Sequence, residues 1–405
     1  MATRHVKRTF KYRFYPTTEQ ADELFRTFGC VRKVYNMALD ARSRAWTDER
    51  RRISYPATSA MLTDWKRTEE LAYLAEVSSV PLQQSLRHLQ AAFTNVFAKR
   101  AKYPRFKSRK KSRAAAEYTR SAFKWSDGQL TLAKMRAPLD ISWSRPLPHG
   151  TEPSTVTVSR DAAGRWFVSL LVEDPGVRPL PANSSAVGID VGISSLVTLS
   201  TGEKVSNPKF ARVDSARLAA AQKDLARKEK GSRNQAKARL KVAKIHARIT
   251  DRRRDFLHKV STRLVQENQL VVIEDLPVHN LLGNRTLARS IADASWTELR
   301  SMLEYKCGWY GRELVVIDRF FPSSKTCVTC GLRRDELPLS VREWSCEGCG
   351  TRHDRDHNAA QNILAAGRAV SACGAGVRPQ RSSSGRAVGD EAGMTMAQAV
   401  GVPAP

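Results

Sequence analysis

The sequence predicts an α/β protein in which a β-rich part with a helical insertion precedes a mixed sheet covered by helices. Two observations support this fold class. Between residues 186 and 317, short apolar runs alternate with longer helical segments, which is the element order of an α/β domain. Before residue 175, strand-like segments lie on both sides of a helical region. A chain of 405 residues is long enough to bury two or three cores.

The N-terminal part begins with alternating, aromatic-rich residues 8–15, which predict a strand. Thr17 and Gln20 then have the spacing of a helix-capping box. Two apolar helix faces follow, made by Leu24, Phe25, Phe28, Val31, Val34, Tyr35 and Leu39, and by Leu82, Leu86, Leu89, Ala92, Phe93 and Phe97. Residues 156–158 and 166–172 are strand-like. We therefore expect one β-barrel that is interrupted by a helical lobe.

The second part begins after a linker at residues 175–185, where residues 186–193 predict a buried strand. Residues 196–205 continue it as a hairpin, and residues 215–265 are helical and densely basic, with a break near Gly231. The apolar side of this helical hairpin is expected to contain Leu218, Leu225, Leu240, Ile245 and Ile249. A strand ending at Glu274, a helix over residues 295–310 and a strand over residues 314–317 complete the pattern. Beyond residue 368 we expect disorder, because the chain becomes rich in Gly, Ser, Ala and Arg.

Charge indicates a nucleic-acid partner, because the net charge is +28 and the pI is near 10.2. The alternatives are a merely soluble or ribosomal-type surface and an anionic membrane. One basic stretch is interleaved with aromatic residues and with a proline that prevents a helix, so it predicts a loop that contacts a phosphate backbone. Its cationic residues are Lys102, Arg105, Lys107, Arg109, Lys110 and Lys111.

Two absences in the sequence bear on the compartment. No apolar run approaches the length that spans a bilayer, and the N-terminus has no apolar signal segment. We therefore expect a cytoplasmic protein whose thiols stay reduced. On this basis Cys30, Cys307 and Cys373 are interpreted as ordinary buried or tail cysteines.

Four of the seven cysteines form two Cys-x-x-Cys pairs, namely Cys327 with Cys330 and Cys346 with Cys349. Each pair can turn two thiolates toward one ion, so two pairs complete the closed tetrahedral shell of a structural zinc site. The alternative is two incidental turns that happen to contain cysteines. The spacing and the glycine after each pair favour zinc.

Three carboxylates are placed where they can meet. Asp190 and Glu274 each end an apolar strand, and Asp356 opens a helix. Carboxylates gathered at one end of a sheet suit Mg²⁺ or Mn²⁺, and such ions can hydrolyse a phosphodiester. Taken singly, Asp190 could shape a glycine turn, Glu274 could pair with an arginine and Asp356 could cap its helix. Together, in so basic a chain, they predict a metal-dependent nuclease.

Four motifs make the chain resemble a known family. They are Gly-Ile-Asp-Val-Gly at residues 188–192, Val-Ile-Glu-Asp-Leu at 272–276, Pro-Ser-Ser-Lys-Thr-Cys at 322–327 and Asp-Arg-Asp-His-Asn-Ala-Ala at 354–360. They resemble the signature of TnpB proteins, the RNA-guided endonucleases encoded by bacterial insertion sequences and related to type V CRISPR effectors. Residues 12–17, 28–32 and 103–107 resemble the N-terminal pattern of the same family, so the resemblance covers about residues 1–368.

The resemblance implies a RuvC-like nuclease core of ribonuclease H type, with Asp190, Glu274 and Asp356 as ligands of Mg²⁺ or Mn²⁺. It implies a zinc ribbon inserted before the third carboxylate, with Asp354 as the alternative third ligand. It also implies a guide RNA and double-stranded target DNA as partners, with a monomer favoured. The expected boundaries are a β-barrel at 1–17 and 102–180, a helical recognition lobe at 18–101, the nuclease domain at 186–320 and 353–368, the ribbon at 321–352 and the tail at 369–405.

Two other functions remain open at this point. A conventional DNA transposase also uses three carboxylates, although the zinc ribbon and the basic N-terminal half argue against it. A nuclease-silent, RNA-guided regulator of DNA would have lost its carboxylates, and all three are present in this chain. The interpretation that we carry forward is an RNA-guided DNA endonuclease that supports maintenance of a transposon.

Overall fold

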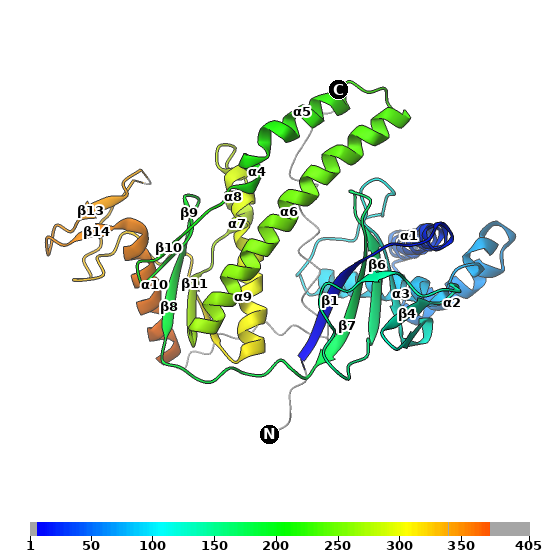
Figure 1. The fold of residues 1–405 in the computed structure, drawn as a ribbon, viewed down its shortest axis with the longest axis horizontal. Helices are drawn as coiled ribbons and strands as arrows, with labels where there is room; N and C mark the ends of the chain where they lie inside the picture. Colours follow the sequence, from blue (N-terminus) through cyan, green and yellow to red (C-terminus); the bar gives the residue numbers. More distant parts are fainter. Residues whose placement is uncertain (1–5, 339, 373–405) are drawn as a thin grey trace. The chain divides into compact units, whose positions relative to one another are not determined.

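The structure is a computed structural model that describes residues 6–338 and 340–372. Its described residues fall into two compact units that divide between Pro175 and Gly176 (Figure 1). Most of the tail expected at residues 369–405 lies outside the described residues. Residues 369–372 still belong to the last helix, so the helix runs four residues beyond the expected boundary.

The first unit is built on a five-stranded antiparallel sheet of order β2-β6-β7-β1-β5. Its strands are β1 (Val6–Phe14), β2 (Ala114–Thr119), β5 (Ile141–Ser142), β6 (Thr155–Arg160) and β7 (Trp166–Asp174). A separate hairpin joins β3 (Phe123–Ser126) to β4 (Gln129–Leu132), and Leu130 and Leu132 add to the same core. This sheet and the β3–β4 hairpin make up the part of the chain that we expected to form a β-barrel, with the described ladder running from β2 to β5.

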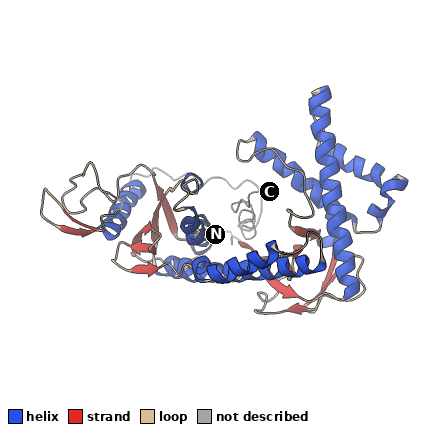
Figure 2. Cartoon of the chain, turned by 90° about the horizontal axis from the view of Figure 1, so that it is seen from above, coloured by secondary structure: helices blue, strands red, loops and turns tan. Residues whose placement is uncertain are grey.

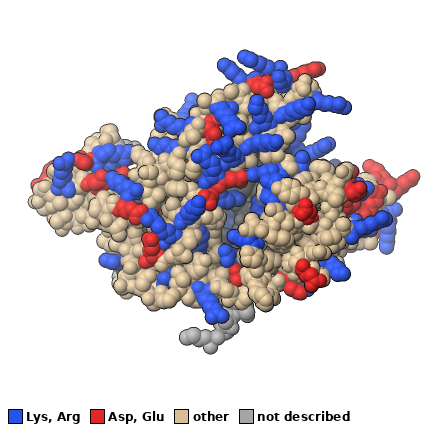
Figure 3. Space-filling model, in the orientation of Figure 1, with Lys and Arg blue, Asp and Glu red and all other residues tan. Residues whose placement is uncertain are grey.

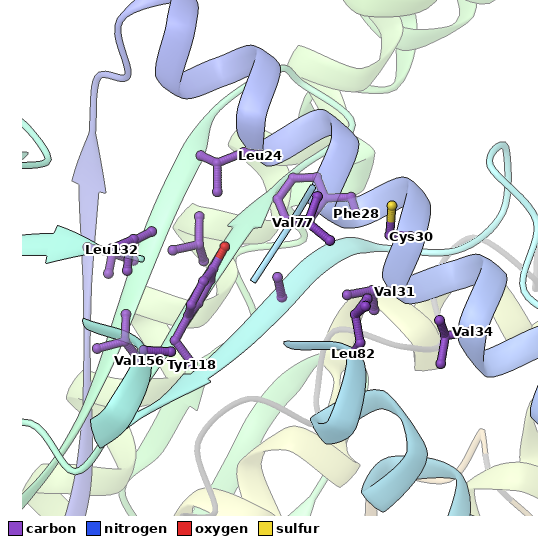
Figure 4. Close-up of a cluster of buried hydrophobic side chains, with 14 of the residues drawn as sticks. Leu24, Phe28, Cys30, Val31, Val34, Val77, Leu82, Tyr118, Leu132 and Val156 are labelled. Atoms are coloured by element: carbon purple, nitrogen blue, oxygen red, sulfur yellow. The ribbon is translucent and has the colours of Figure 1, made fainter. Parts of the chain in front are cut away.

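The helices of this unit lie between β1 and β2 in the chain: α1 (Thr18–Glu49), α2 (Tyr55–Arg67), the 3-10 helix η1 (Glu69–Ala75) and α3 (Ser79–Phe97). The predicted capping box is confirmed. The Thr17 side chain accepts a hydrogen bond from the backbone N–H of Gln20, and the Gln20 side chain accepts one from the backbone N–H of Thr17. One face of α1 packs on the sheet, where Leu24 and Phe28 lie in one core with Tyr118 (Figure 4). Two predicted core positions are wrong, because Phe25 is 46% exposed and Phe97 is 69% exposed. Helix α2 was not predicted.

The second unit is built on a mixed five-stranded sheet of order β10-β9-β8-β11-β12. The strands are β8 (Ala186–Val191), β9 (Ser195–Leu199), β10 (Lys204–Ser206), β11 (Leu270–Glu274) and β12 (Glu313–Ile317). Strands β8, β11 and β12 are parallel, whereas β9 and β10 join as an antiparallel meander. Every strand predicted after the linker is present.

Helices cover both faces of this sheet, because strand side chains alternate between them (Figure 2). Val187, Ile189 and Val271 pack against α6 (Arg233–Glu267) and α9 (Trp296–Tyr310). Val272 faces α10 (Arg355–Ala372) on the other side. The predicted helical hairpin is confirmed as α5 (Ser215–Ala226) and α6, but Leu240 is 37% exposed and does not belong to its apolar side.

Short elements complete the two units: η2 (Arg120–Ala122), α4 (Phe210–Val213), α7 (Val278–Leu281) and α8 (Ala288–Ala294). Strands β13 (Glu343–Ser345) and β14 (Arg352–Asp354) pair in a small ribbon directly before α10. None of the described helices has the length and apolarity that crossing a membrane requires.

Candidate active site and metal centre

The register of two parallel strands places Asp190 and Glu274 at the same end of the sheet. Ile189 of β8 is paired with Ile273 of β11, and each acid is the next residue along its strand. Because side chains alternate, Asp190 shares a face with Gly188, and Glu274 shares one with Val272. That is the face covered by α10.

Helix α10 approaches this face unusually closely because two glycines leave room for it. A Cβ built on Gly188 would lie 2.2 Å from the carbonyl oxygen of Ala360, and one built on Gly367 would lie 2.4 Å from Val272. The crossing fixes the start of α10 at the carboxyl ends of β8 and β11 (Figure 1). Asp356 lies in the first turn of that helix.

The pKa of Asp190 depends on the other two acids. The pKa of Asp190 is raised well above its usual range, first by burial and then by the charges of Glu274 and Asp356. Burial also raises the pKa of Glu274. Two buried carboxyls with a raised pKa beside a third acid form the kind of environment that a divalent cation neutralises.

Glu274 is held by a hydroxyl that the sequence alone did not indicate. Ser323 donates a hydrogen bond of 2.6 Å to Glu274 Oε1, and Ser323 is itself buried. Its loop is tied to α10, because Asn362 donates to the carbonyls of Ser323 (2.8 Å) and Thr326 (2.6 Å). Asn358 donates to Thr326 O (2.8 Å) and accepts from Val328 N (3.0 Å). Helix α10, which carries Asp356, therefore also holds the loop of Ser323, the hydrogen-bond partner of Glu274.

The acidic neighbours of the three carboxylates have other partners. Asp354 accepts the backbone N–H of His357 at 2.9 Å, which caps α10, and pairs with Lys204 at 2.6 Å. Asp275, next to Glu274, pairs with Arg300 and Arg319. Both of these carboxyls have a lowered pKa.

An arginine from the ribbon reaches the third carboxylate. Arg342 Nη1 lies 3.4 Å from Asp356 Oδ1, and its charge offsets a small part of the rise in the pKa of Asp190. This residue was also missed from sequence, since nothing distinguishes it locally from the many other arginines of the chain.

The four predicted cysteines come together. Their sulfur atoms all lie within 4.8 Å of one another, and among the described residues they are the one set of side chains compact enough to hold a metal ion. Cys327 and Cys349 are 3.7 Å apart and Cys330 and Cys346 are 3.5 Å apart, close to the roughly 3.8 Å edge of a tetrahedron with 2.3 Å bonds. The three carboxylates do not form such a compact set.

The two cysteine pairs have the same backbone geometry, which explains the glycine after each. Gly331 N donates to Cys327 O and Gly350 N to Cys346 O, and both glycines have positive φ, 76° and 72°. A further residue was not foreseen: His353 Nε2 lies 3.1 Å from the sulfur of Cys327.

The predicted basic stretch in the first unit is mostly exposed. Five of its six cations are exposed, namely Lys102, Arg105, Arg109, Lys110 and Lys111. Lys107 differs, because its ammonium lies 3.9 Å over the ring of Tyr35 and burial lowers its pKa to about 8. In the second unit, Lys and Arg also gather over α5 and the adjoining half of α6 (Figure 3).

Three family models match parts of the chain. One described as "Probable transposase" matches residues 167–285, a "Cas12f1-like, TNB domain" matches residues 296–363 and a "Helix-turn-helix domain" matches residues 1–51. The first covers Asp190 and Glu274, and the second covers the four cysteines and Asp356. In this structure residues 6–49 form strand β1 and the single long helix α1.

Similar proteins match nearly the whole chain. A "Putative RNA-guided DNA endonuclease" of Streptomyces pristinaespiralis is 74% identical and the match covers 94% of both chains. "Putative RNA-guided DNA endonuclease InsQ" of Escherichia coli K12 is 34% identical over 92% of this chain and 95% of its own. The chain of a Cas12f1–sgRNA–target DNA complex shares the fold, with a TM-score of 0.57 at 14% identity, covering 89% of this chain and 99% of that one. The chain therefore belongs to the TnpB family of insertion-sequence proteins that its motifs indicated.

Proposed function

We propose that the protein is an RNA-guided DNA endonuclease that hydrolyses phosphodiester bonds of target DNA beside a short adjacent motif. The observation that supports the proposal is that Asp190 and Glu274 lie at the same end of two adjacent parallel strands, and that Asp356, in the first turn of α10, is near enough for its charge to raise the pKa of Asp190. The names of the near full-length relatives support the substrate and the guide.

The three carboxylates would hold Mg²⁺ or Mn²⁺. Their oxygen donors suit these hard cations, and the raised pKa of Asp190 reflects first its burial and then repulsion by Glu274 and Asp356, which a cation relieves. A bound divalent ion supplies a hydroxide nucleophile at neutral pH and stabilises the leaving oxygen. Ser323 would keep Glu274 ionised and oriented, and Arg342 would face the phosphate beside Asp356.

Asp356, and not Asp354, is the third ligand in this proposal. Asp354 is engaged by Lys204 and by the helix N-terminus, so its oxygens are already satisfied. Asp356 instead contributes to the raised pKa of Asp190.

The four cysteines would bind one structural Zn²⁺. All four positions of a tetrahedral ion would be filled by thiolates, so no position remains for a substrate. The site would hold the ribbon at residues 321–352 in place, and with it Arg342.

Guide RNA and target DNA would occupy the basic surfaces. We assign residues 1–17 and 102–180 to a wedge-like sheet domain, 18–101 to a recognition lobe, and 186–320 with 353–368 to the RuvC-like nuclease domain. Lys102, Arg105, Lys107, Arg109, Lys110 and Lys111 would contact phosphates. A protein that holds a heteroduplex by its backbone leaves sequence readout to base pairing. Such a nuclease would work in the cytosol or nucleoid.

A conventional transposase is the second candidate, because the family model over residues 167–285 is described as a probable transposase. The two functions differ in their need for RNA. We would compare RNA-loaded and RNA-free protein, with Mg²⁺, on a matched duplex and on one mismatched beside the adjacent motif. Cleavage of the matched duplex by RNA-loaded protein alone is expected. Equal cleavage or joining by RNA-free protein would favour the transposase.

A further inference from the structure

A pocket of about 790 Å³ opens in the first unit, far along the chain from the acidic residues. The C-terminal halves of α1 and α3, residues 51–54 with the start of α2, and Tyr103 line it. This volume lies within the range of about 300–1,000 Å³ that is usual for ligand sites.

Aromatic side chains form the walls of this pocket and remain accessible. Trp46 is 44% exposed, Phe97 is 69% exposed and Tyr103 is 52% exposed. Phe93 lies behind them, with its ring edge-on to Tyr103 at 5.5 Å and stacked on Phe97 at 6.2 Å. Three large exposed aromatic residues around one concavity are an unusual arrangement for a surface that stays solvated.

The polar groups of the pocket are cationic. Its lining includes four arginines and no carboxylate. Arg52 lies over the rings of both Trp46 (5.7 Å) and Phe97 (5.6 Å), and Arg87 lies over Tyr55 (5.8 Å). Positive charge among aromatic faces attracts a flat, electron-rich group attached to phosphate.

Arg42 provides an independent sign of a ligand. It is only 8% exposed, and its Nη2 donates to Gln90 at 2.7 Å. Its buried Nε has no hydrogen-bond partner among the described residues, and no carboxylate pairs with it there. A buried cation with a spare donor is costly unless an acceptor meets it.

We propose that this pocket binds one unstacked nucleotide of a single-stranded RNA or DNA segment. The base would lie against Trp46 and Phe97, Arg42 would donate to an acceptor atom on the base edge, and Arg52 would contact a flanking phosphate. A base inside a duplex exposes no face for such stacking, so the site would select single strands. The inference does not depend on nuclease activity.

The test measures binding by full-length protein freed of nucleic acid, in buffer without divalent cations. The probes are fluorescein-labelled RNA and DNA single strands of about eight nucleotides and a duplex of the same sequence. Phe97→Ala should raise the Kd for a single strand about tenfold and change the Kd for the duplex less than twofold. Because Phe97 is 69% exposed, this change should not affect folding. The single strand whose Kd rises in Phe97→Ala, RNA or DNA, identifies the source of the nucleotide.

Matched controls lie on the same lobe outside the pocket. Tyr73→Ala removes an aromatic residue that is 41% exposed, and Arg67→Gln removes an exposed positive charge. Both controls should leave discrimination between single strand and duplex unchanged. A strand carrying 4-thiouridine or 4-thiothymidine should also crosslink to Trp46, Phe97 or Tyr103. If Phe97→Ala matches Tyr73→Ala on every probe, or weakens duplex and single strand equally, the proposal is wrong.

Discussion

Gly188 and Ala360 meet backbone to backbone at the centre of the second unit. A Cβ on Gly188 would lie 2.2 Å from the Ala360 carbonyl oxygen and 2.6 Å from Leu364 N. Helix α10 can cross β8 at this distance only if the residue has no side chain. Asp356 lies one helical turn before Ala360, so this contact sets where the third carboxylate stands relative to Asp190.

Gly188→Ala should therefore displace α10 and destabilise the second unit by about 3 kcal/mol, because the added Cβ would collide with backbone atoms of the helix, which cannot rotate aside as a side chain can. Cleavage should be lost while RNA binding by the first unit persists. The control is Gly308→Ala, since no atom lies within 4 Å of the added Cβ on that exposed helix position. It should stabilise by about 0.5–1 kcal/mol. Thermal unfolding and RNA binding would be measured for both variants. Unchanged cleavage by Gly188→Ala would contradict this account.

Asp190→Asn should abolish cleavage and also raise the melting temperature of the metal-free protein by about 2–4 °C. The folded chain raises the pKa of Asp190 above 3.8, so it binds this proton more tightly than the unfolded chain does. The contribution of Asp190 to the free energy of unfolding therefore falls as the pH rises through its pKa in the folded chain. The variant has no such loss, so its advantage should grow as the pH rises from near 3.8 toward the raised pKa of Asp190 in the folded chain, and then level off. An advantage that shrinks with rising pH would refute the argument.

Ser323→Ala should raise the Mg²⁺ concentration needed for half-maximal cleavage by about 10–100-fold. The lost hydrogen bond favours the ionised form of Glu274, so the pKa of Glu274 should rise further. Ser323→Thr keeps the hydroxyl and should recover most of the activity. A loss of rate at saturating Mg²⁺ with no change in Mg²⁺ dependence would show that Ser323 does not act through the metal.

Asp354 and Asp356 should respond differently to removal of charge. Asp356→Asn should abolish cleavage, whereas Asp354→Asn should cost about 1 kcal/mol of stability or less and retain activity, because Asn also caps helices. Cleavage assays and melting curves of the two variants show which aspartate acts as a metal ligand and which only caps the helix. The reverse pattern would make Asp354 the third ligand.

Cys327→Ser should reduce bound zinc from about one ion per chain to nearly none and unfold the ribbon, because structural zinc contributes on the order of 10 kcal/mol to local folding. Cleavage should fall with it, since Arg342 and the loop of Ser323 depend on the ribbon. Cys30→Ser is the control, as Cys30 is a buried cysteine outside the cluster. Elemental analysis of both proteins decides the matter, and full zinc content in Cys327→Ser would disprove the assignment.

Sequence alone predicted the features that local patterns encode. Apolar strands ending in Asp190 and Glu274 place both acids at one edge of a sheet, and the capping box at Thr17 begins a helix as predicted. Each Cys-x-x-Cys pair brings two cysteines together. Each of these signals is a pattern within a short stretch of sequence, so no knowledge of tertiary packing is needed to read it.

Contacts between distant segments could not be predicted in this way. Ser323 meets Glu274 across 49 residues, and the role of Arg342 depends on how the ribbon folds back on α10. Phe97 was assigned to a core because helical periodicity records which residues share a face, not whether another element covers it. The same misassignment hid the pocket, whose walls come from three separate helices and the segment around Tyr103.

The position of α10 as the last described helix has a consequence for synthesis of the chain. A nascent chain acquires Asp190 and Glu274 long before Asp356, and until α10 emerges nothing covers Gly188 and Val272. Domains fold as units during translation, at about 5–20 residues per second. The acidic site is therefore completed only when almost all of the described chain has left the ribosome, and products truncated within the ribbon should carry a folded first unit without the ability to cleave.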